Sequence, residues 1–272
     1  MSQFDKYLKK NNSEEKKYCL YWLTSFGIQS VVNLKPSEFL LDLIVRHIEG
    51  EIDLKRVQTS INEHYHRLRK EEDQKGHHTF EADKVSARIV ELFFNPHFNL
   101  SLDGFKETHH HMFHGIYAHS GELRQHPASK KEWVLGNSSV LYPKAEEIEE
   151  HMNYLFETER NFDYSHLSRK HKLRHFCDFI SKLFIYNTFQ YANSRVAFVY
   201  AMQYMLSKGY EFSNDTFFRE AWYFRNAIIR ASYTNMHQGI YPTTEYMEMF
   251  LDNLFFDADN ELRNHRMVIK GE

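Results

Sequence analysis

Residues 187–195 read NTFQYANSR and interrupt the apolar segment 183–206, LFIYNTFQYANSRVAFVYAMQYML. Asn, Gln and Ser side chains compete with the backbone for hydrogen bonds, so a cluster of them favours a helix end or a loop over a helix interior. Helical patterns flank the cluster, over 166–186 and 194–208. We therefore expect two helices joined by a polar loop, and this loop is the first candidate for a functional site.

The composition indicates an ordinary globular protein built from helices. Of the 272 residues, 42% are hydrophobic and 26% are charged, which is enough for one core. Only 10 glycines and 5 prolines occur, which favours long helices over a turn-rich β protein. The formal net charge is −3 and no long basic run occurs, so nucleic acid is not an expected partner.

The sequence also predicts a soluble chain. Its first residues are polar and charged, unlike a signal peptide. No apolar run approaches the ~18 residues that a membrane-spanning helix needs, so no membrane partner is expected. Cys19 and Cys177 lie far apart in apolar surroundings, which is typical of buried free thiols in a reducing compartment. We expect a cytoplasmic protein.

Helical periodicity runs through most of the chain and predicts an all-α architecture. A helix is expected over about 38–50, where Ser37 supplies an N-cap and Gly50 a stop. Residues 1–17 are expected to form a flexible or weakly helical tail, and 71–78, EEDQKGHH, a loop. Further helices are expected over 53–70, 81–94, 103–118, 145–157, 166–186, 194–208, 214–231 and 243–255.

One stretch, residues 124–144, lacks this periodicity. It has a proline near each end and a Gly-Asn pair between EWVL and SSVLY. The pattern predicts a β-hairpin with strands over 132–135 and 139–142 and a turn over 136–138. Because amphipathic aromatic side chains commonly bury their rings, Trp133 is expected to pack rather than to contact a target.

The order of these pieces resembles the Fic family of proteins. Residues 105–124, FKETHHHMFHGIYAHSGELR, are similar to the family's H-x-x-L-F … Y … A-G-x-x-R region. The loop NTFQYANSR then stands where the family carries its active-site motif, H-x-F-x-[DE]-G-N-G-R. The positions that match in the first region are His109, Phe113, Tyr117, Gly121 and Arg124.

The resemblance covers roughly residues 35–265 and implies a fido-type helical fold. It implies an N-terminal inhibitory helix at about 38–50 and a β-hairpin flap at about 131–143. It leaves 1–34 as an N-terminal tail or helical extension and 266–272 as a C-terminal tail. In the family the flap pairs with an extended segment of the target, and the flap residues here are Trp133, Val134 and Leu135.

Fic proteins transfer AMP from ATP to a hydroxyl group of a target protein, and the resemblance implies this activity only where the reactive residues are present. The family's general base is a histidine, but Asn187 stands in its place. Losing a positioned base costs ~10²–10⁴ in rate. The carboxylate that would hold Mg²⁺ is replaced by Tyr191, and the two glycines by Ala192 and Ser194.

Other parts of the motif remain. Asn193 and Arg195 match nucleotide-binding positions of the family, and Phe189 matches the residue that packs the loop into the core. A second arginine that many members carry is replaced by Phe198. We therefore expect no metal and no cofactor, with binding of ATP and Mg²⁺ weak or absent.

Glu49 and Gly50 match the last two positions of the family's inhibitory motif, [ST]-x-x-x-E-[GN], although Val45 stands at the first. The resemblance implies that Glu49 blocks a nucleotide site by pairing with its arginine. A simpler alternative is that Glu49 ends a helix and Gly50 caps it. We favour a retained inhibitory glutamate.

The histidine-rich run offers a metal-site alternative. His109, His110 and His111, with His114 and His119, are close in sequence, but no acidic or cysteine partner lies at ligand spacing. A structural or solvated role is therefore favoured over metal binding. A relocated base is a further alternative, but His171 and His175 lie three or more helical turns before the loop.

These observations favour a catalytically inactive Fic-like protein, a pseudoenzyme that acts as a bacterial antitoxin or regulator. It would present Glu49 in trans to an active Fic protein, as a heterodimer, or form a homo-oligomer. The alternative is an active protein adenylyltransferase with an atypical site, and a third reading is a nucleotide sensor without catalysis.

Overall fold

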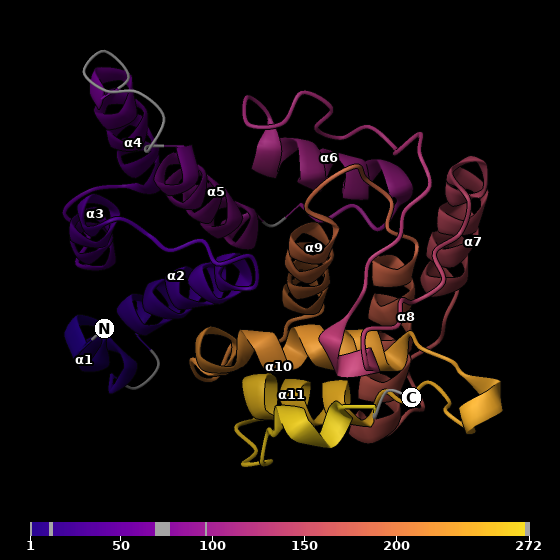
Figure 1. The fold of residues 1–272 in the computed structure, drawn as a ribbon. Helices are drawn as coiled ribbons and strands as arrows, with labels where there is room; N and C mark the ends of the chain where they lie inside the picture. The colour runs from indigo at the N-terminus through magenta and orange to yellow at the C-terminus, as the bar shows by residue number, and fades with distance from the viewer. Residues whose placement is uncertain (1, 11–12, 69–76, 96, 270–272) are drawn as a thin grey trace.

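The computed structural model describes residues 2–10, 13–68, 77–95 and 97–269, and this part of the chain is all-α (Figure 1). It contains eleven α-helices and five 3-10 helices and no β-strand. The 3-10 helices are η1 Ser2–Phe4, η2 Trp133–Leu135, η3 Ala145–Glu147, η4 Met236–Gln238 and η5 Asn264–Met267. The α-helices are α1 Asp5–Leu8, α2 Glu14–Ser30, α3 Glu38–Ile48, α4 Leu54–Leu68, α5 His77–Phe94, α6 Leu102–Phe113, α7 Ile148–Arg160, α8 Arg169–Ile185, α9 Asn193–Ser207, α10 Thr216–Ala231 and α11 Glu245–Phe256.

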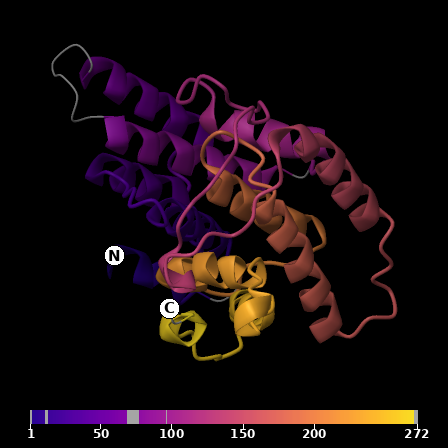
Figure 2. The ribbon, with the colours of Figure 1, turned by 45° about the vertical axis from the view of Figure 1, so that its right-hand side comes forward.

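Two helices, α2 and α9, form the centre of the molecule. Both are apolar on all sides, which is the pattern of a helix enclosed by others. Every side chain of α2 from Cys19 to Gln29 is buried, and so is every side chain of α9 from Arg195 to Met205. α9 packs against α5, α6 and α8, and α2 packs against α3, α5 and α10, as Figures 1 and 2 show. The predicted interruption of the apolar segment 183–206 is confirmed, since α8 and α9 are separate helices.

The capping residues explain where α3 begins and ends. The Ser37 hydroxyl accepts a hydrogen bond from the Leu40 amide at 3.0 Å, which is the predicted N-cap. At the other end Gly50 has φ +76°, its amide donates to His47 O, and the Glu51 amide donates to Arg46 O at 2.9 Å. This pair of bonds defines a Schellman ending, so the predicted start and stop are both confirmed.

The N-terminal segment differs from the expected tail. Residues 5–8 form α1, and α2 begins directly after its N-cap Ser13. Phe4 and Tyr7 are buried in the same core as α2. The polar composition of residues 1–17 conceals these two aromatic anchors, which is why the sequence predicts a tail. Cys19 is a buried free thiol, as is Cys177, and both expectations are confirmed.

The predicted β-hairpin is wrong. Figures 1 and 2 show the segment between α6 and α7 descending to α10 and returning, but only one isolated bridge, Lys131 to Ser139, joins its two arms. Residues 133–135 form the 3-10 helix η2 instead of a strand. The reason is that Val134 and Leu135, which are neighbours in sequence, are both buried, whereas a strand would point them to opposite faces.

The tip of this segment is anchored through a buried ion pair. Both carboxylate oxygens of Glu132 accept hydrogen bonds from Arg225 Nη2 on α10, at 2.9 and 2.8 Å, and both side chains are buried. Trp133 is 48% exposed, so the expectation that its ring packs is also wrong.

The loop expected at 71–78 lies largely outside the described residues. The expected C-terminal tail is described to residue 269, where the Ile269 amide donates to Val134 O at 2.8 Å.

Gly27 allows α2 and α10 to approach closely, and this contact generates the first prediction. A Cβ at Gly27 would lie 2.4 Å from Phe217 O, which is backbone and cannot rotate away. Gly27→Ala is expected to lower the free energy of unfolding by about 1–3 kcal/mol through overpacking, which exceeds the ~0.5–1 kcal/mol gained from helix propensity. Urea denaturation measures the change.

The exposed α2 residue Lys17 provides the control, because Lys17→Ala adds no atom to the interface. It is expected to change stability by less than about 0.5 kcal/mol. A Gly27→Ala variant as stable as Lys17→Ala would contradict the tight α2–α10 contact.

Candidate functional site

The loop 187–195 connects α8 to α9 through two residues in the left-handed region. Asn187 has φ 46° and ends α8, its amide donating to Phe184 O at 3.1 Å. Ala192 has φ 60° and precedes the first turn of α9. Glycine adopts this conformation with the least strain, so Ala192 holds a backbone conformation that favours glycine.

Hydrogen bonds from two directions fix the shape of the loop. Arg124 donates from its amide to Thr188 O at 2.9 Å and from Nε to Asn187 O at 2.7 Å. The Asn193 side chain closes the loop from within, since its Oδ1 accepts from the Phe189 amide at 2.8 Å and its Nδ2 donates to Phe189 O at 2.6 Å. The Phe189 side chain is fully buried, as predicted.

His109 supports the loop from α6. Its Nδ1 accepts a hydrogen bond from the Gly121 amide at 2.8 Å, so the ring nitrogen facing Tyr191 O at 3.2 Å is the donor. The imidazole stacks on Phe189 with 4.0 Å between ring centroids. Burial lowers the pKa of His109 to about 4, so the ring is neutral at physiological pH. His109 is therefore a structural support for the loop.

Arg195 lies at the base of the loop, and its charge is compensated within the protein. Its Nη1 lies 2.8 Å from Glu81 Oε1 on α5 and donates to Gln29 Oε1 on α2 at 2.8 Å. Its Nη2 donates to the Tyr117 hydroxyl at 2.7 Å, and Tyr117 in turn donates to Glu81. The guanidinium carbon also lies 4.8 Å from the centroid of the Phe113 ring.

The structure thus brings together the residues of the 105–124 region and the loop. His109 and Arg124 bind the loop, the Gly121 amide donates to the His109 ring, and Phe113 and Tyr117 contact Arg195. Glu81 completes this set but could not be found from the sequence, because an acidic residue on an amphipathic helix gives no sign of a partner so far along the chain.

A cavity of about 420 Å³ lies between the loop and the segment around Lys130. Its charged side chains are largely engaged, since Glu132 is paired with Arg225 and Arg124 is bound to backbone carbonyls. Burial, with the nearby Arg225, lowers the pKa of Lys130. The cavity is lined by Val32, Arg124, His126, Pro127, Ala128, Ser129, Lys130, Glu132, Tyr142, Phe184, Asn187, Phe189, Gln190, Tyr191, Ala192, Asn193, Ser194 and Arg195.

Two neutral side chains of the loop 187–195 line this cavity. Asn187 and Tyr191 both line it, and the Tyr191 ring is 55% exposed and lies against Tyr117, with 5.4 Å between centroids. The first amides of α9 offer a partial positive charge, but Arg195 adds no free charge because Glu81 pairs with it. The arrangement can hold a small polar group.

Glu49 and the predicted flap residues do not meet at this cavity. Glu49 Oε1 lies 2.7 Å from Lys6 Nζ and accepts from the Tyr7 hydroxyl at 2.6 Å. These hydrogen bonds lower the pKa of Glu49. Glu49 therefore pairs with the N-terminal helix α1 and not with Arg195. Among the flap residues, Val134 and Leu135 are buried against the core and Trp133 alone is exposed.

The remaining histidines of the histidine-rich run, and His175, each contact a different partner. His110 Nδ1 lies 3.0 Å from Ser120 O, His111 Nε2 lies 2.9 Å from Glu91 Oε2, and His114 Nε2 lies 2.8 Å from Arg88 Nη2. His119 lies beside Glu122 and His175 beside Glu159. In the part of the chain that the structure describes, no group of three or more His, Cys, Asp or Glu side chains is placed to hold a metal ion.

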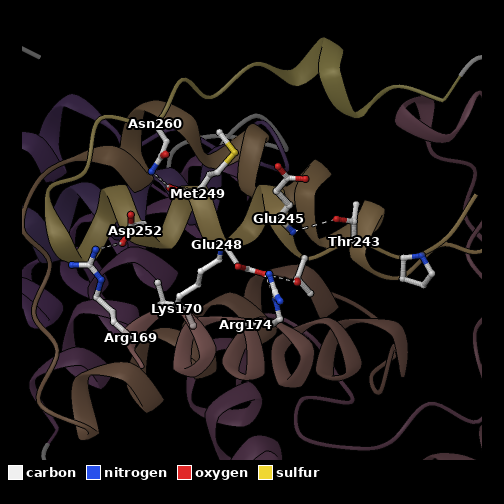
Figure 3. A pocket seen from close by; sticks show the side chains of 12 residues that line it. Arg169, Lys170, Arg174, Thr243, Glu245, Glu248, Met249, Asp252 and Asn260 are labelled. Carbon is white, nitrogen blue, oxygen red and sulfur yellow. Dashed lines mark hydrogen bonds and ion pairs between the residues drawn. The ribbon is translucent and has the colours of Figure 1, made fainter. Parts of the chain in front are cut away.

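A larger cavity, of about 640 Å³, lies between the first half of α8 and α11 (Figure 3). Arginines of α8 face carboxylates of α11 across it: Arg174 Nε lies 3.0 Å from Glu248, and Arg169 Nη2 lies 3.5 Å from Asp252. These pairs link the two helices, so the charged groups of this cavity serve the packing of α8 on α11.

No family model, curated protein or solved structure matches this chain. Among the described helices, none combines the length and the apolar character that crossing a lipid bilayer requires.

The left-handed backbone at Ala192 generates a stability prediction. Ala192→Gly is expected to raise the free energy of unfolding by about 0.5–1 kcal/mol, because the strain of ~1–2 kcal/mol at a left-handed alanine exceeds the entropic cost of a glycine. Ala197→Gly, inside α9, is the matched control and is expected to destabilise by about 1 kcal/mol or more. Thermal and urea unfolding distinguish the two signs. Destabilisation by both variants would contradict the strained loop.

The buried His109 generates a pH prediction. Its pKa falls from about 6.5 in the unfolded chain to about 4 in the folded protein, so the unfolded chain binds more protons between these values. Stability from the neutral ring is therefore present above about pH 6.5 and is lost as the pH falls towards about 4, by at most about 3 kcal/mol.

His109→Gln is expected to reduce the loss of unfolding free energy between about pH 7.5 and about pH 4.5, because glutamine does not titrate. The exposed His119→Gln is the control and is expected to leave that difference unchanged. Equal pH dependence of the wild type and the His109→Gln variant would show that His109 is not held neutral.

Proposed function

We propose that this chain is a Fic-like protein that does not transfer AMP and that regulates an active Fic AMP-transferase by binding it, in the manner of an antitoxin. One observation carries the proposal. Contacts from His109, Arg124 and Asn193 hold the loop 187–195 in a defined shape, whereas Asn187 and Tyr191 occupy the positions of the base and the Mg²⁺ ligand. A maintained loop without reactive groups suits a role in binding.

The electrostatics of the cavity support weak or absent binding of ATP and Mg²⁺. A triphosphate requires cations that are free to approach it. Arg195 is bound to Glu81, and Arg124 is bound to the carbonyl oxygens of Asn187, His126 and Pro143. The chain's own carboxylate and carbonyl groups thus occupy the donors that a phosphate would use.

Glu49 remains the residue that we propose to inhibit a partner protein in trans. In this chain, however, its carboxylate is bound by residues of the N-terminal segment and not by the arginine that the resemblance implies. It is partly exposed at the end of α3 and is held by Lys6 and Tyr7. To reach the nucleotide site of a partner it must exchange these two donors for an arginine of that partner. Such an exchange replaces one charge-assisted pair with another, so α1 competes with the partner for Glu49.

A second candidate, an active adenylyltransferase with an atypical site, is favoured by one observation. His126 and Glu132 line the same cavity as the loop. His126 has the chemistry of a general base, although Glu132 is already paired with Arg225. His126 supports this candidate because it lines the cavity, whereas the relocated bases considered from the sequence are His171 and His175.

The regulatory role is tested with an active Fic protein that carries an intact H-x-F-x-[DE]-G-N-G-R motif and is encoded beside this chain. Added wild-type chain is expected to form a complex in size-exclusion chromatography and to reduce labelling of targets by radiolabelled ATP. Glu49→Ala is expected to keep the complex but weaken inhibition by about tenfold or more, because the charge-assisted pair is lost. Glu51→Ala, also an exposed glutamate beside α3, is the matched control.

Catalysis by the chain itself is tested in the same labelling assay without a partner. No Mg²⁺-dependent labelling is expected from the wild type, and Asn187→His combined with Tyr191→Glu is expected to restore a low rate. If the wild type labels robustly and the His126→Ala substitution abolishes that labelling, the proposal is overturned and the second candidate is established.

A further inference from the structure

A smaller cavity, of about 180 Å³, lies between α8, the end of α9 and the segment that joins α7 to α8. Its walls are four aromatic rings and two aliphatic side chains, and two lysines complete the lining. This volume is below the range of ~300–1,000 Å³ that drug-sized ligands occupy, so it suits a ligand of about one ring. The lining residues are Tyr164, Lys172, Leu173, Phe176, Tyr204, Met205, Lys208 and Tyr210.

A buried carboxylate fixes the orientation of two of these rings. Glu159 is 3% exposed, and its Oε1 accepts from both the Tyr164 and the Tyr204 hydroxyls. Its Oε2 lies 2.8 Å from His175 Nε2, and His175 in turn stacks on Phe162. Because both hydroxyls are committed to Glu159, these tyrosines offer rings rather than hydroxyl groups to a ligand.

Lys172 and Lys208 determine whether this cavity favours a cationic or an anionic ligand. Aromatic walls alone would suit a cation, but the ammonium of Lys208 already lies 5.2 Å from the Tyr204 ring centroid and 5.7 Å from that of Tyr164. Within the described residues, neither Lys208 nor Lys172 forms an ion pair with a carboxylate. The cavity therefore combines aromatic and aliphatic walls with two ammonium groups that form no ion pair with a carboxylate, and these groups favour an anion over a cation.

We propose that this cavity is a binding site for a small monocarboxylate with one aromatic ring. The ring packs among Phe176, Leu173 and Met205, and the carboxylate takes hydrogen bonds from the ammonium groups of Lys172 and Lys208. The site does not depend on the loop 187–195 and is independent of the regulatory function proposed above.

The test is isothermal titration calorimetry of the full chain with benzoate as the probe. Benzoate is expected to bind at one site with a Kd on the order of 1 mM, as a ligand of this size allows. Benzamide has the same shape without the charge and is expected to bind about tenfold more weakly, because the charge-assisted hydrogen bonds are lost. Benzylamine, the cationic probe, is expected not to bind.

Lysine variants locate the site and have little effect on folding, because neither side chain is buried. The double variant Lys172→Gln/Lys208→Gln is expected to weaken benzoate binding by about tenfold or more and to remove the preference over benzamide. Lys170→Gln, on the same helix but lining the cavity between α8 and α11, is the matched control and is expected to bind as the wild type does. Absence of saturable benzoate binding, equal affinity for benzoate and benzamide, or an equal loss in Lys170→Gln would each overturn the proposal.

Discussion

The buried guanidinium of Arg195 is the contact on which the arrangement of the central helices depends. It joins the start of α9 to Glu81 on α5, to Gln29 on α2 and to Tyr117 in the segment after α6. A charge in the interior is tolerated only when it is paired and hydrogen-bonded. Removing one partner of such a pair costs roughly 3–5 kcal/mol, so this network fixes how the four segments meet.

The hydrogen bonds and the ion pair of Arg195 also limit the charge that the candidate site can offer to a ligand. Arg195 lines the cavity beside the loop, but its charge is compensated by Glu81. On the other side of the cavity, Glu132 is neutralised in the same way by Arg225. Two ion pairs therefore link the walls of the cavity and leave little free charge for a ligand.

Much of the helical framework could be predicted from the sequence, because it is encoded locally. Ser37 and Gly50 mark the ends of α3, and the polar cluster at 187–195 separates α8 from α9. The segment around Trp133 could not be predicted, because Glu132 pairs with Arg225 on a helix about ninety residues later and draws Val134 and Leu135 inwards together. A Gly-Asn turn signal cannot reveal such a distant partner.

The sequence by itself determined most of the helices after residue 37 and the residues that the loop offers: an amide and a phenol, without a histidine or a carboxylate at those positions. Only the tertiary structure decided how the ionisable groups are paired. It assigns Glu81 to Arg195, Glu49 to Lys6 and Glu159 to His175. The physical reason is that helix formation depends on neighbours in the chain, whereas ion pairing depends on distances between side chains that only the folded packing sets.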